Sequence, residues 1–283
     1  MTKTFIGFNH GQYGDLFIGL TTASVLKSIM PECKLIYSIN HKFADCKEAF
    51  LYSKDIDDII IWDQYDNWPG PKDLQLLQDL KAKYPELYLF HPNARHKQND
   101  WYLYRHQTAE NCEMHNLPAP SEKQMHFCLE KPDGIEYGDY ISICPFTSFG
   151  QRKNLTPNIL RAIKTFADTH GLAIIQLGSK QESAIEGFYK FEGTYFQSIV
   201  KMLGSLFLVS ADTGMIWAAS AYNHPTIGFY SYGFYPGAIT AKNWTPKNTN
   251  QTSFESDYIS NIDISSLPNA LTNIYKLASS YRS

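Results

Sequence analysis

Four short segments of the sequence carry residues suited to binding an anion or moving a proton. The most informative is Asp212-Thr213-Gly214, which follows the mainly apolar run 207–211 and ends at the first residue of a helical pattern. The first N–H groups of a helix have no partner within it and lie at the positive end of its dipole. We expect these groups and the Thr213 hydroxyl to bind a diphosphate. Simple N-capping by Asp212 and Thr213 is the alternative.

The second segment, residues 145–157, places the hydroxyls of Thr147 and Ser148 and the cations Arg152 and Lys153 after another apolar run. Ligands of open α/β sheets bind outside the carboxyl ends of the strands, so phosphate contact is expected in this loop. Lys153 could offset the negative charge that develops on a departing nucleoside diphosphate. A solvated basic turn is the alternative interpretation.

The remaining two segments each contribute a carboxylate. Glu182 follows an expected strand, where a carboxylate can accept both hydroxyls of a ribose, although acids are also common at helix N-termini. Asp15 ends the segment 11–15, which contains Gly11 and Gly14 and precedes a helical pattern. It can serve as a general base or as a helix cap. The segment fits neither G-x-x-x-x-G-K-[ST] nor G-x-G-x-x-G.

Strand and helix patterns alternate along the chain, which predicts parallel sheets flanked by helices. The expected strands are 4–8, 34–39, 58–62, 87–90, 140–145, 172–178, 206–210 and 226–230. The expected helices are 15–30, 43–51, 74–84, 101–114, 157–170, 181–190, 195–203, 214–222 and 268–281.

Residues 116–137 carry several prolines and no clear period, and we interpret them as a linker. A chain of 283 residues exceeds the roughly 100–200 residues of one typical domain. We therefore expect an α/β fold of two Rossmann-like, doubly wound domains facing a cleft. Their predicted bounds are 1–130 and 136–265, with a C-terminal helix at 266–283.

Composition excludes several classes of protein. Hydrophobic residues make up 43% and charged residues 19%, as in ordinary globular proteins. The net charge of −3 gives no general attraction to polyanions. The nearest nucleic-acid candidate is a basic cluster interleaved with aromatic rings, made of Arg95, His96, Lys97, Trp101, Tyr102, Tyr104, Arg105 and His106. A solvated helix face explains that cluster equally well.

The cysteines and the apolar runs bear on the compartment. Cys33, Cys46, Cys112, Cys128 and Cys144 form no C-x-x-C pair, and we expect reduced, mostly buried thiols. The N-terminal residues lack a long apolar region, and no stretch approaches the ~18 apolar residues of a membrane span. These features predict a cytoplasmic protein.

The four segments, in this order, resemble those of the bacterial heptosyltransferases and related members of glycosyltransferase family nine. Gly14-Asp15 before a helix looks like the family's opening, and Asp212-Thr213-Gly214 looks like its D-T-G signature. The resemblance implies that Asp15 is the catalytic base. It also implies that Thr147, Ser148 and Lys153 bind phosphate, with Lys153 assisting departure, and that Glu182 binds the ribose.

The resemblance further implies the GT-B fold, with the acceptor bound by the first domain and a nucleotide sugar by the second. It implies inverting sugar transfer to a hydroxyl acceptor, such as a glycan or lipopolysaccharide, with no metal and no cofactor besides the donor substrate. Two features depart from the family pattern. Trp217 stands where histidine is common, and residues 230–235 form an aromatic loop in place of a small, polar one.

Three other functions remain open at this point. A sugar-nucleotide epimerase shares the architecture and needs no acceptor, and a viral-type DNA-modifying glycosyltransferase shares the chemistry. A catalytically silent nucleotide-sugar-binding module would use the same residues without turnover.

Overall fold

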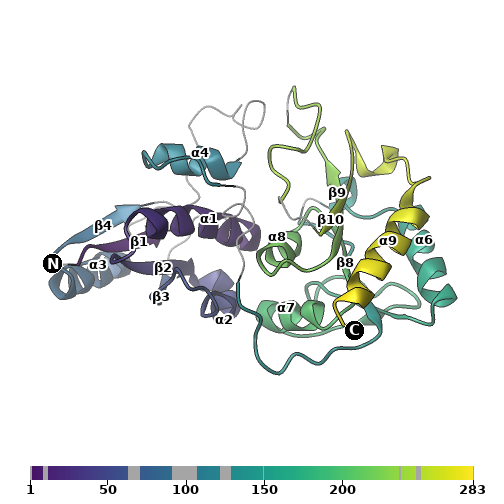
Figure 1. The fold of residues 1–283 in the computed structure, drawn as a ribbon, viewed down its shortest axis with the longest axis horizontal. Helices are drawn as coiled ribbons and strands as arrows, with labels where there is room; N and C mark the ends of the chain where they lie inside the picture. Colours follow the sequence, from purple (N-terminus) through teal and green to yellow (C-terminus); the bar gives the residue numbers. More distant parts are fainter. Residues whose placement is uncertain are drawn as a thin grey trace. The chain divides into compact units, whose positions relative to one another are not determined.

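The computed structural model describes residues 2–8, 12–62, 71–90, 107–121, 129–148, 150–235, 237–246 and 250–282. The chain divides into two compact units, Met1–Glu130 and Lys131–Ser283. Each unit is built on one parallel β-sheet with helices packed against it (Figure 1).

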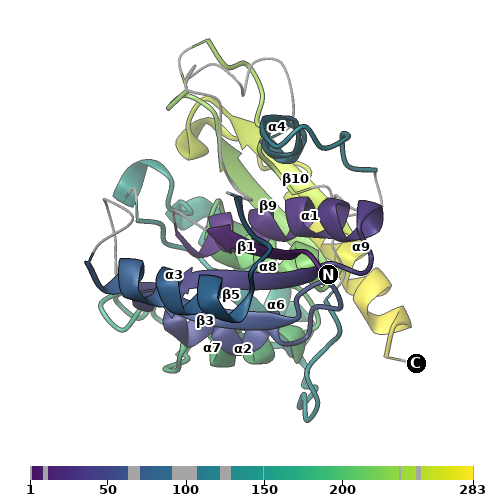
Figure 2. The ribbon, with the colours of Figure 1, turned by 90° about the vertical axis from the view of Figure 1, so that its left-hand side faces the viewer.

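The first unit has a four-stranded sheet in the order β3-β2-β1-β4, and every neighbouring pair is parallel. Its elements are β1 (Thr4–Phe8), α1 (Tyr13–Ile29), β2 (Lys34–Asn40), the 3-10 helix η1 (His41–Cys46), α2 (Lys47–Phe50), β3 (Asp58–Trp62), α3 (Pro71–Lys83), β4 (Leu87–Phe90) and α4 (Gln107–Met114). Helix α4 lies beside α1 (Figure 2).

Helices cover both faces of this sheet. On one face, Ile6 and Ile36 form a buried cluster with Leu80 of α3. On the other, the Tyr37 hydroxyl donates a hydrogen bond of 2.6 Å to the Leu16 carbonyl of α1. Successive strand side chains point to opposite faces, which explains why Ile36 and Tyr37, neighbours in β2, pack toward different helices. The expected double winding is confirmed in this unit.

The second unit has a six-stranded parallel sheet in the order β10-β9-β8-β5-β6-β7. Its elements are β5 (Tyr140–Cys144), η3 (Gly150–Arg152), α6 (Pro157–Thr169), β6 (Ala173–Gln176), β7 (Tyr189–Lys190), α7 (Tyr195–Leu203), β8 (Leu208–Ala211), α8 (Gly214–Ala221), β9 (Thr226–Ser231), β10 (Gln251–Ser256), η4 (Ile259–Asn261) and α9 (Leu267–Ser280).

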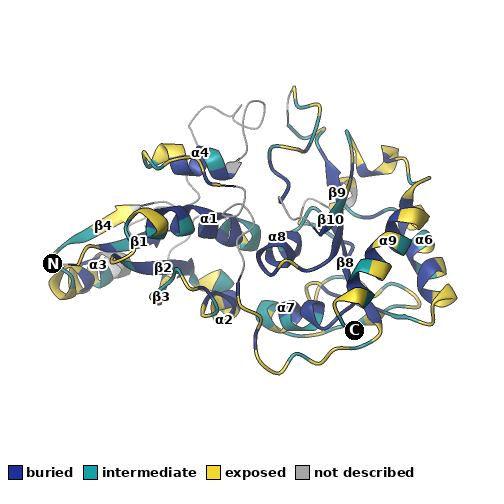
Figure 3. Cartoon of the chain, viewed as in Figure 1, coloured by how far each residue is buried: buried dark blue, intermediate teal, exposed yellow. Residues whose placement is uncertain are grey.

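This sheet is also covered on both faces. Ile163 of α6 and Leu271 of α9 join the inward residues of the central strands in one apolar cluster. Helices α7 and α8 pack on the opposite face, where Gly228 of β9 leaves room for Ile216, since a Cβ at Gly228 would lie 2.6 Å from the Ile216 Cδ1. The inner faces are buried, while α6 and α9 expose their outer faces (Figure 3).

Local sequence explains where helices begin. Pro157 occupies the first turn of α6, where a missing N–H has no consequence. At α7 the Thr194 hydroxyl accepts the Gln197 N–H at 3.1 Å, and the Gln197 side chain accepts the Thr194 N–H at 2.8 Å. This reciprocal pair satisfies two N–H groups that a bare helix end would leave unpaired.

The expected helix at 181–190 is wrong. The segment after β6 runs as a loop to the short strand β7, and Gly187 has a φ of 80°. The buried Gln176 side chain donates to the Ser183 carbonyl at 2.9 Å and accepts the Ile185 N–H at 2.9 Å. These bonds satisfy backbone groups that a helix would otherwise pair, so the loop is stable without one.

Three smaller differences concern element type and extent. The expected helix at 43–51 is a 3-10 turn, η1, followed by the single turn α2. Strand β10 was not expected, because only Phe254 of its six residues is buried. Of the expected helix at 101–114, residues 107–114 form α4 and residues 101–106 lie outside the described residues.

Cys33, Cys46, Cys112 and Cys144 are buried free thiols, as expected, and Cys128 lies outside the described residues. In the described part of the chain, none of the helices combines the length and the apolar character needed to span a bilayer.

Arg282 ties the segment after α9 to the segment before β5 and to the C-terminal end of α7. Its guanidinium donates to the Gly138 carbonyl at 2.9 Å and to the Gly204 carbonyl at 2.7 Å. We predict that Arg282→Ala lowers the free energy of unfolding by about 2 kcal/mol, because it removes two charge-assisted hydrogen bonds. Urea denaturation measures this, with Lys276→Ala on the exposed side of α9 as the control. Equal midpoints for both variants would contradict the prediction.

Candidate functional site

The topology of the second sheet places two of the predicted segments side by side. From β5 the chain continues to β6 and β7 on one side, and it returns to β8 on the other side of β5. Cys144, at the end of β5, lies opposite Ser210 of β8. Ligands of open α/β sheets bind at such a reversal of strand order, outside the carboxyl ends. The loop with Thr147 and the turn with Asp212 follow these two strands.

The start of α8 carries no cap from its N-cap side chain. Thr213 is the N-cap residue, with extended backbone angles of φ −126° and ψ 168°, and its hydroxyl makes no capping hydrogen bond. The hydroxyl instead lies 3.1 Å from the Ser210 Oγ. Thr213 and Gly214 are partly exposed. Capping by Thr213 therefore does not explain the motif, and an anion could approach the first amides of the helix.

Lys153 and Asp212 form an ion pair, with Nζ and Oδ2 3.1 Å apart. Their side chains are 4% and 14% exposed. The Lys153 ammonium also lies 5.2 Å from the Phe234 ring centroid and 5.6 Å from that of Tyr235. The interpretation of Lys153 as part of a solvated basic turn is therefore wrong, whereas its neighbour Arg152 is exposed.

Thr147 presents a buried oxygen at the same edge. Its N–H donates to the Asn154 Oδ1 at 2.8 Å, which holds the loop. Its Oγ1 is buried and has no hydrogen-bond partner among the described residues. Buried polar groups are nearly always paired, so this oxygen indicates a place for a ligand or a water molecule. Ser148, next in sequence, is exposed.

Glu182 lies at the carboxyl end of β6 in a partly buried position. Its Oε2 is buried without a partner among the described residues. The carboxylate packs directly over Gly178, where any Cβ would collide with it. Burial raises the pKa of Glu182, and hydrogen bonds from Ser179 and the charge of Lys190 oppose that rise. Because this segment is not helical, Glu182 is not a helix N-terminal acid.

Asp15 lies in the first turn of α1, after β1, where the strand order of the first sheet reverses. Its Oδ2 accepts the Gln12 N–H at 2.9 Å, so the carboxylate does cap the helix. The Tyr13 hydroxyl donates to the Asp45 Oδ1 at 2.8 Å and ties η1 to the same helix start. Capping fixes the carboxylate in place and is compatible with a role as base, which stays a prediction.

Some predicted features lie outside the described residues. These are Gly11 and the basic cluster between Arg95 and His106. Within the part that is described, no three His, Cys, Asp or Glu residues form a group that could hold a metal ion.

The cover of rings over Lys153 was not predicted. The sequence shows an aromatic loop at 230–235, but the spacing alone does not reveal which side chain the loop contacts. Tyr235 packs against Trp244 at 4.5 Å and Phe234 against Tyr258 at 6.2 Å between ring centroids. The loop is therefore part of the site and not a separate surface feature.

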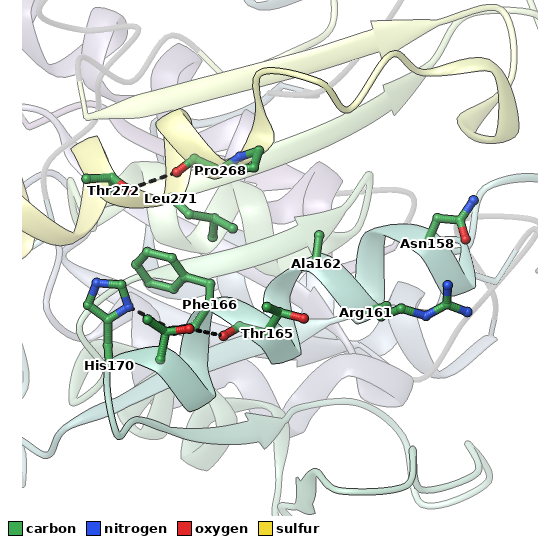
Figure 4. A pocket seen from close by; sticks show the side chains of 10 residues that line it. Asn158, Arg161, Ala162, Thr165, Phe166, His170, Pro268, Leu271 and Thr272 are labelled. Carbon is green, nitrogen blue, oxygen red and sulfur yellow. Dashed lines mark hydrogen bonds between the residues drawn. The ribbon is translucent and has the colours of Figure 1, made fainter.

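A groove of about 500 Å³ lies elsewhere, between α6 and α9 (Figure 4). None of the predicted site residues lines it. The His170 Nδ1 and the Thr272 hydroxyl both lie 2.9 Å from carbonyls of their own helices, so these polar groups are already engaged. The strand ends offer polar groups better suited to a ligand than this groove does.

Comparison with known proteins relates the chain to others by structure alone. No protein-family model matches the sequence, and no curated protein matches it. The E. coli ADP-heptose LPS heptosyltransferase II is 13% identical, with a TM-score of 0.70, over 99% of this chain and 100% of that one.

Two further structures are similar over most of the chain. The E. coli heptosyltransferase WaaC with ADP is 13% identical, with a TM-score of 0.64, over 98% of this chain and 100% of that one. A family 9 glycosyl transferase from Veillonella parvula is 13% identical, with a TM-score of 0.68, over 90% of this chain and 87% of that one. The expected likeness is confirmed, and the chain has the GT-B fold of the heptosyltransferases.

The raised pKa of Glu182 gives a test of its environment. Because burial raises the pKa in the folded state, the ionised carboxylate costs stability, and this cost grows as pH rises through the range between the unfolded and folded values. We predict that Glu182→Gln is more stable than the wild type at pH 7 and that the difference shrinks below about pH 4.

Urea denaturation across this pH range measures the effect, with Glu186→Gln at an exposed position as the control. A Glu182→Gln protein less stable than the wild type at pH 7 would show that the carboxylate stabilises the fold, which is the opposite of a residue kept for a ligand.

Proposed function

We propose that this protein is a glycosyltransferase that moves a sugar from a nucleotide-diphosphate sugar to a hydroxyl of an acceptor. The single observation that carries the proposal is the position and the capping of the start of α8. It lies at the reversal of strand order and is not capped by its N-cap side chain. A diphosphate bound there would accept hydrogen bonds from the first amides of α8 and would lie at the positive end of the helix dipole.

Donor binding uses the polar groups at the carboxyl edge of the second sheet. The proposed phosphate ligands are the amides at Thr213 and Gly214 and the hydroxyls of Thr147, Ser148 and Thr213. The unpaired Oγ1 of Thr147 supports this role, because a phosphate oxygen would need a donor there. Glu182 is the proposed acceptor for the ribose hydroxyls, and its buried, unpaired Oε2 supports that assignment.

The proposed reaction is a single in-line displacement. Asp15 takes the proton of the acceptor hydroxyl as that oxygen bonds to the anomeric carbon, and the bond from this carbon to the diphosphate oxygen breaks. One displacement inverts the anomeric centre. Lys153 and the fixed donors of the second unit stabilise the departing diphosphate without a metal ion, and a well-placed donor contributes about 3–4 kcal/mol to such a step.

The partner classes follow from the same chemistry. The proposed donor is a nucleoside diphosphate linked to a heptose or a related sugar, since structurally similar enzymes are ADP-heptose transferases. The proposed acceptor is a glycan such as lipopolysaccharide.

We predict that Asp15→Asn lowers turnover by about 10²- to 10⁴-fold, because the amide cannot take the acceptor proton. Its carbonyl oxygen can still accept the Gln12 N–H, so the helix cap is kept. Steady-state kinetics and donor affinity are measured together, with Glu48→Gln in the first turn of α2 as the control. Unchanged turnover of Asp15→Asn would exclude Asp15 as the base.

A second prediction concerns the donor. We expect one of ADP, GDP, UDP or CDP to raise the free energy of unfolding by about 2.7 kcal/mol at 100 times its dissociation constant. Thermal-shift measurements over this panel identify the base, and the matching sugar nucleotides are then incubated with and without acceptor. Isomerised sugar formed without acceptor would indicate an epimerase, and stabilisation by none of the four would contradict donor binding.

A further inference from the structure

The carboxylate of Asp212 lies beside the proposed diphosphate position. Asp212 directly precedes Thr213, the N-cap residue of α8, and its Oδ2 pairs with the Lys153 Nζ at 3.1 Å. The side chains are only 14% and 4% exposed, so salt and water screen this pair much less than a surface pair. The charge of each partner therefore matters strongly to anything bound next to it.

A carboxylate at this position works against anion binding. The amides and the dipole of α8 favour a negative group at the helix start, whereas a bare Asp212 charge would repel a diphosphate over the same short distance. Lys153 cancels that charge, because the ion pair is neutral as a whole. The affinity of the site for an anion thus depends on whether Asp212 is paired.

The Lys153 ammonium is enclosed on its other sides. The residue is 3% exposed, and its Nζ lies 5.2 Å from the Phe234 ring centroid and 5.6 Å from that of Tyr235. Both distances are within the range at which an aromatic ring attracts a cation. An ammonium held by a carboxylate and two rings is less able to extend toward a bound phosphate than a solvated lysine at a loop tip.

The aromatic cover, residues Phe234 and Tyr235, is fixed by contacts that do not involve Lys153. The Gly233 N–H donates to the Asp257 carbonyl at 2.8 Å, and a Cβ at Gly233 would lie 2.5 Å from that oxygen. The Tyr235 ring packs on Trp244 at 4.5 Å between centroids. Backbone and packing thus place the rings where the ammonium lies, so the cover can orient Lys153.

We propose that Lys153 acts on the diphosphate through Asp212, by cancelling its charge, and that Phe234 and Tyr235 are positioning residues that hold the ammonium against this carboxylate. The proposal rests on the proposed function, since it assigns how the same donor site tolerates an anion. If Lys153 donated directly to the leaving group, removing both charges together would not restore binding. Under the present proposal, removing both charges should restore it.

Inorganic pyrophosphate is the probe, because it carries the anionic group without base or sugar. Its affinity is measured by calorimetry for the wild type, Lys153→Met and the double variant Lys153→Met/Asp212→Asn. We expect Lys153→Met to bind about 100-fold more weakly, because Asp212 is left unpaired. We expect the double variant to return to within about threefold of the wild type, because its pair is again neutral.

A double variant as weak as Lys153→Met would overturn the proposal, because it would show that the ammonium itself contacts the anion. Lys153→Met leaves a carboxylate with little solvent exposure and could fail to fold. The double variant, compared directly with the wild type, then decides: near-equal affinity supports charge cancellation, and a loss of about 100-fold contradicts it.

The rings are tested separately with the charges intact. We expect Phe234→Leu and Tyr235→Leu each to weaken pyrophosphate binding by about fivefold, and Tyr235→Phe to keep wild-type affinity because the ring remains. In the charge-free double variant, Tyr235→Leu should have no effect on affinity. An equal loss in both backgrounds would mean that the ring acts on the loop and not on the ammonium.

The result separates this inference from the proposed function. The expected pattern with pyrophosphate, together with no sugar transfer from any donor, would contradict the function alone. Sugar transfer together with an unrestored double variant would contradict the inference alone. No pyrophosphate binding by the wild type would overturn the inference.

Discussion

Parallel pairing of the strands in each sheet is the constraint on which the rest of the structure depends. In a parallel sheet all carboxyl ends meet at one edge, so every loop that follows a strand emerges on the same side. In the second unit this edge gathers segments that are far apart in sequence: the loop with Thr147, the loop with Glu182 and the turn before α8. In the first unit the equivalent edge is where α1 begins and where Asp15 lies.

The polar groups at the carboxyl edge of the second sheet are only partly paired with one another, which distinguishes them from ordinary structural contacts. The Lys153 and Asp212 charges cancel, whereas the oxygens of Thr147 and Glu182 are buried without a partner among the described residues. A folded protein normally pairs such atoms, because an unpaired buried oxygen costs stability. Their persistence at a reversal of strand order fits a site completed by a ligand.

The sequence predicts most of the fold because the apolar runs and the helical spacing agree with the final packing. In β1 to β4, and in the helices next to β5 and β8 along the chain, the spacing of the apolar residues indicates one type of element. The helix expected at 181–190 was wrong because a single buried side chain, Gln176, satisfies backbone groups of this segment, and local periodicity carries no information about that contact. The edge strand β10 was missed because its residues are mostly polar.

The sequence indicates which residues form the candidate site, but it does not indicate their environment. Asp212-Thr213-Gly214 is recognisable because a strand, a turn and a helix start follow each other within a few residues. The burial of Lys153 depends on an ion pair between residues 59 positions apart and on the loop carrying Phe234 and Tyr235. Contacts of this kind are set by tertiary packing, so no spacing rule gives them.

The proposed function depends on nucleoside diphosphate binding at the start of α8. A crystal structure of the protein grown with the nucleotide that stabilises it most would test this directly. We expect the diphosphate within hydrogen-bonding distance of the Gly214 amide, with the ribose against Glu182. A nucleotide bound in the groove between α6 and α9, with the start of α8 unoccupied, would contradict it.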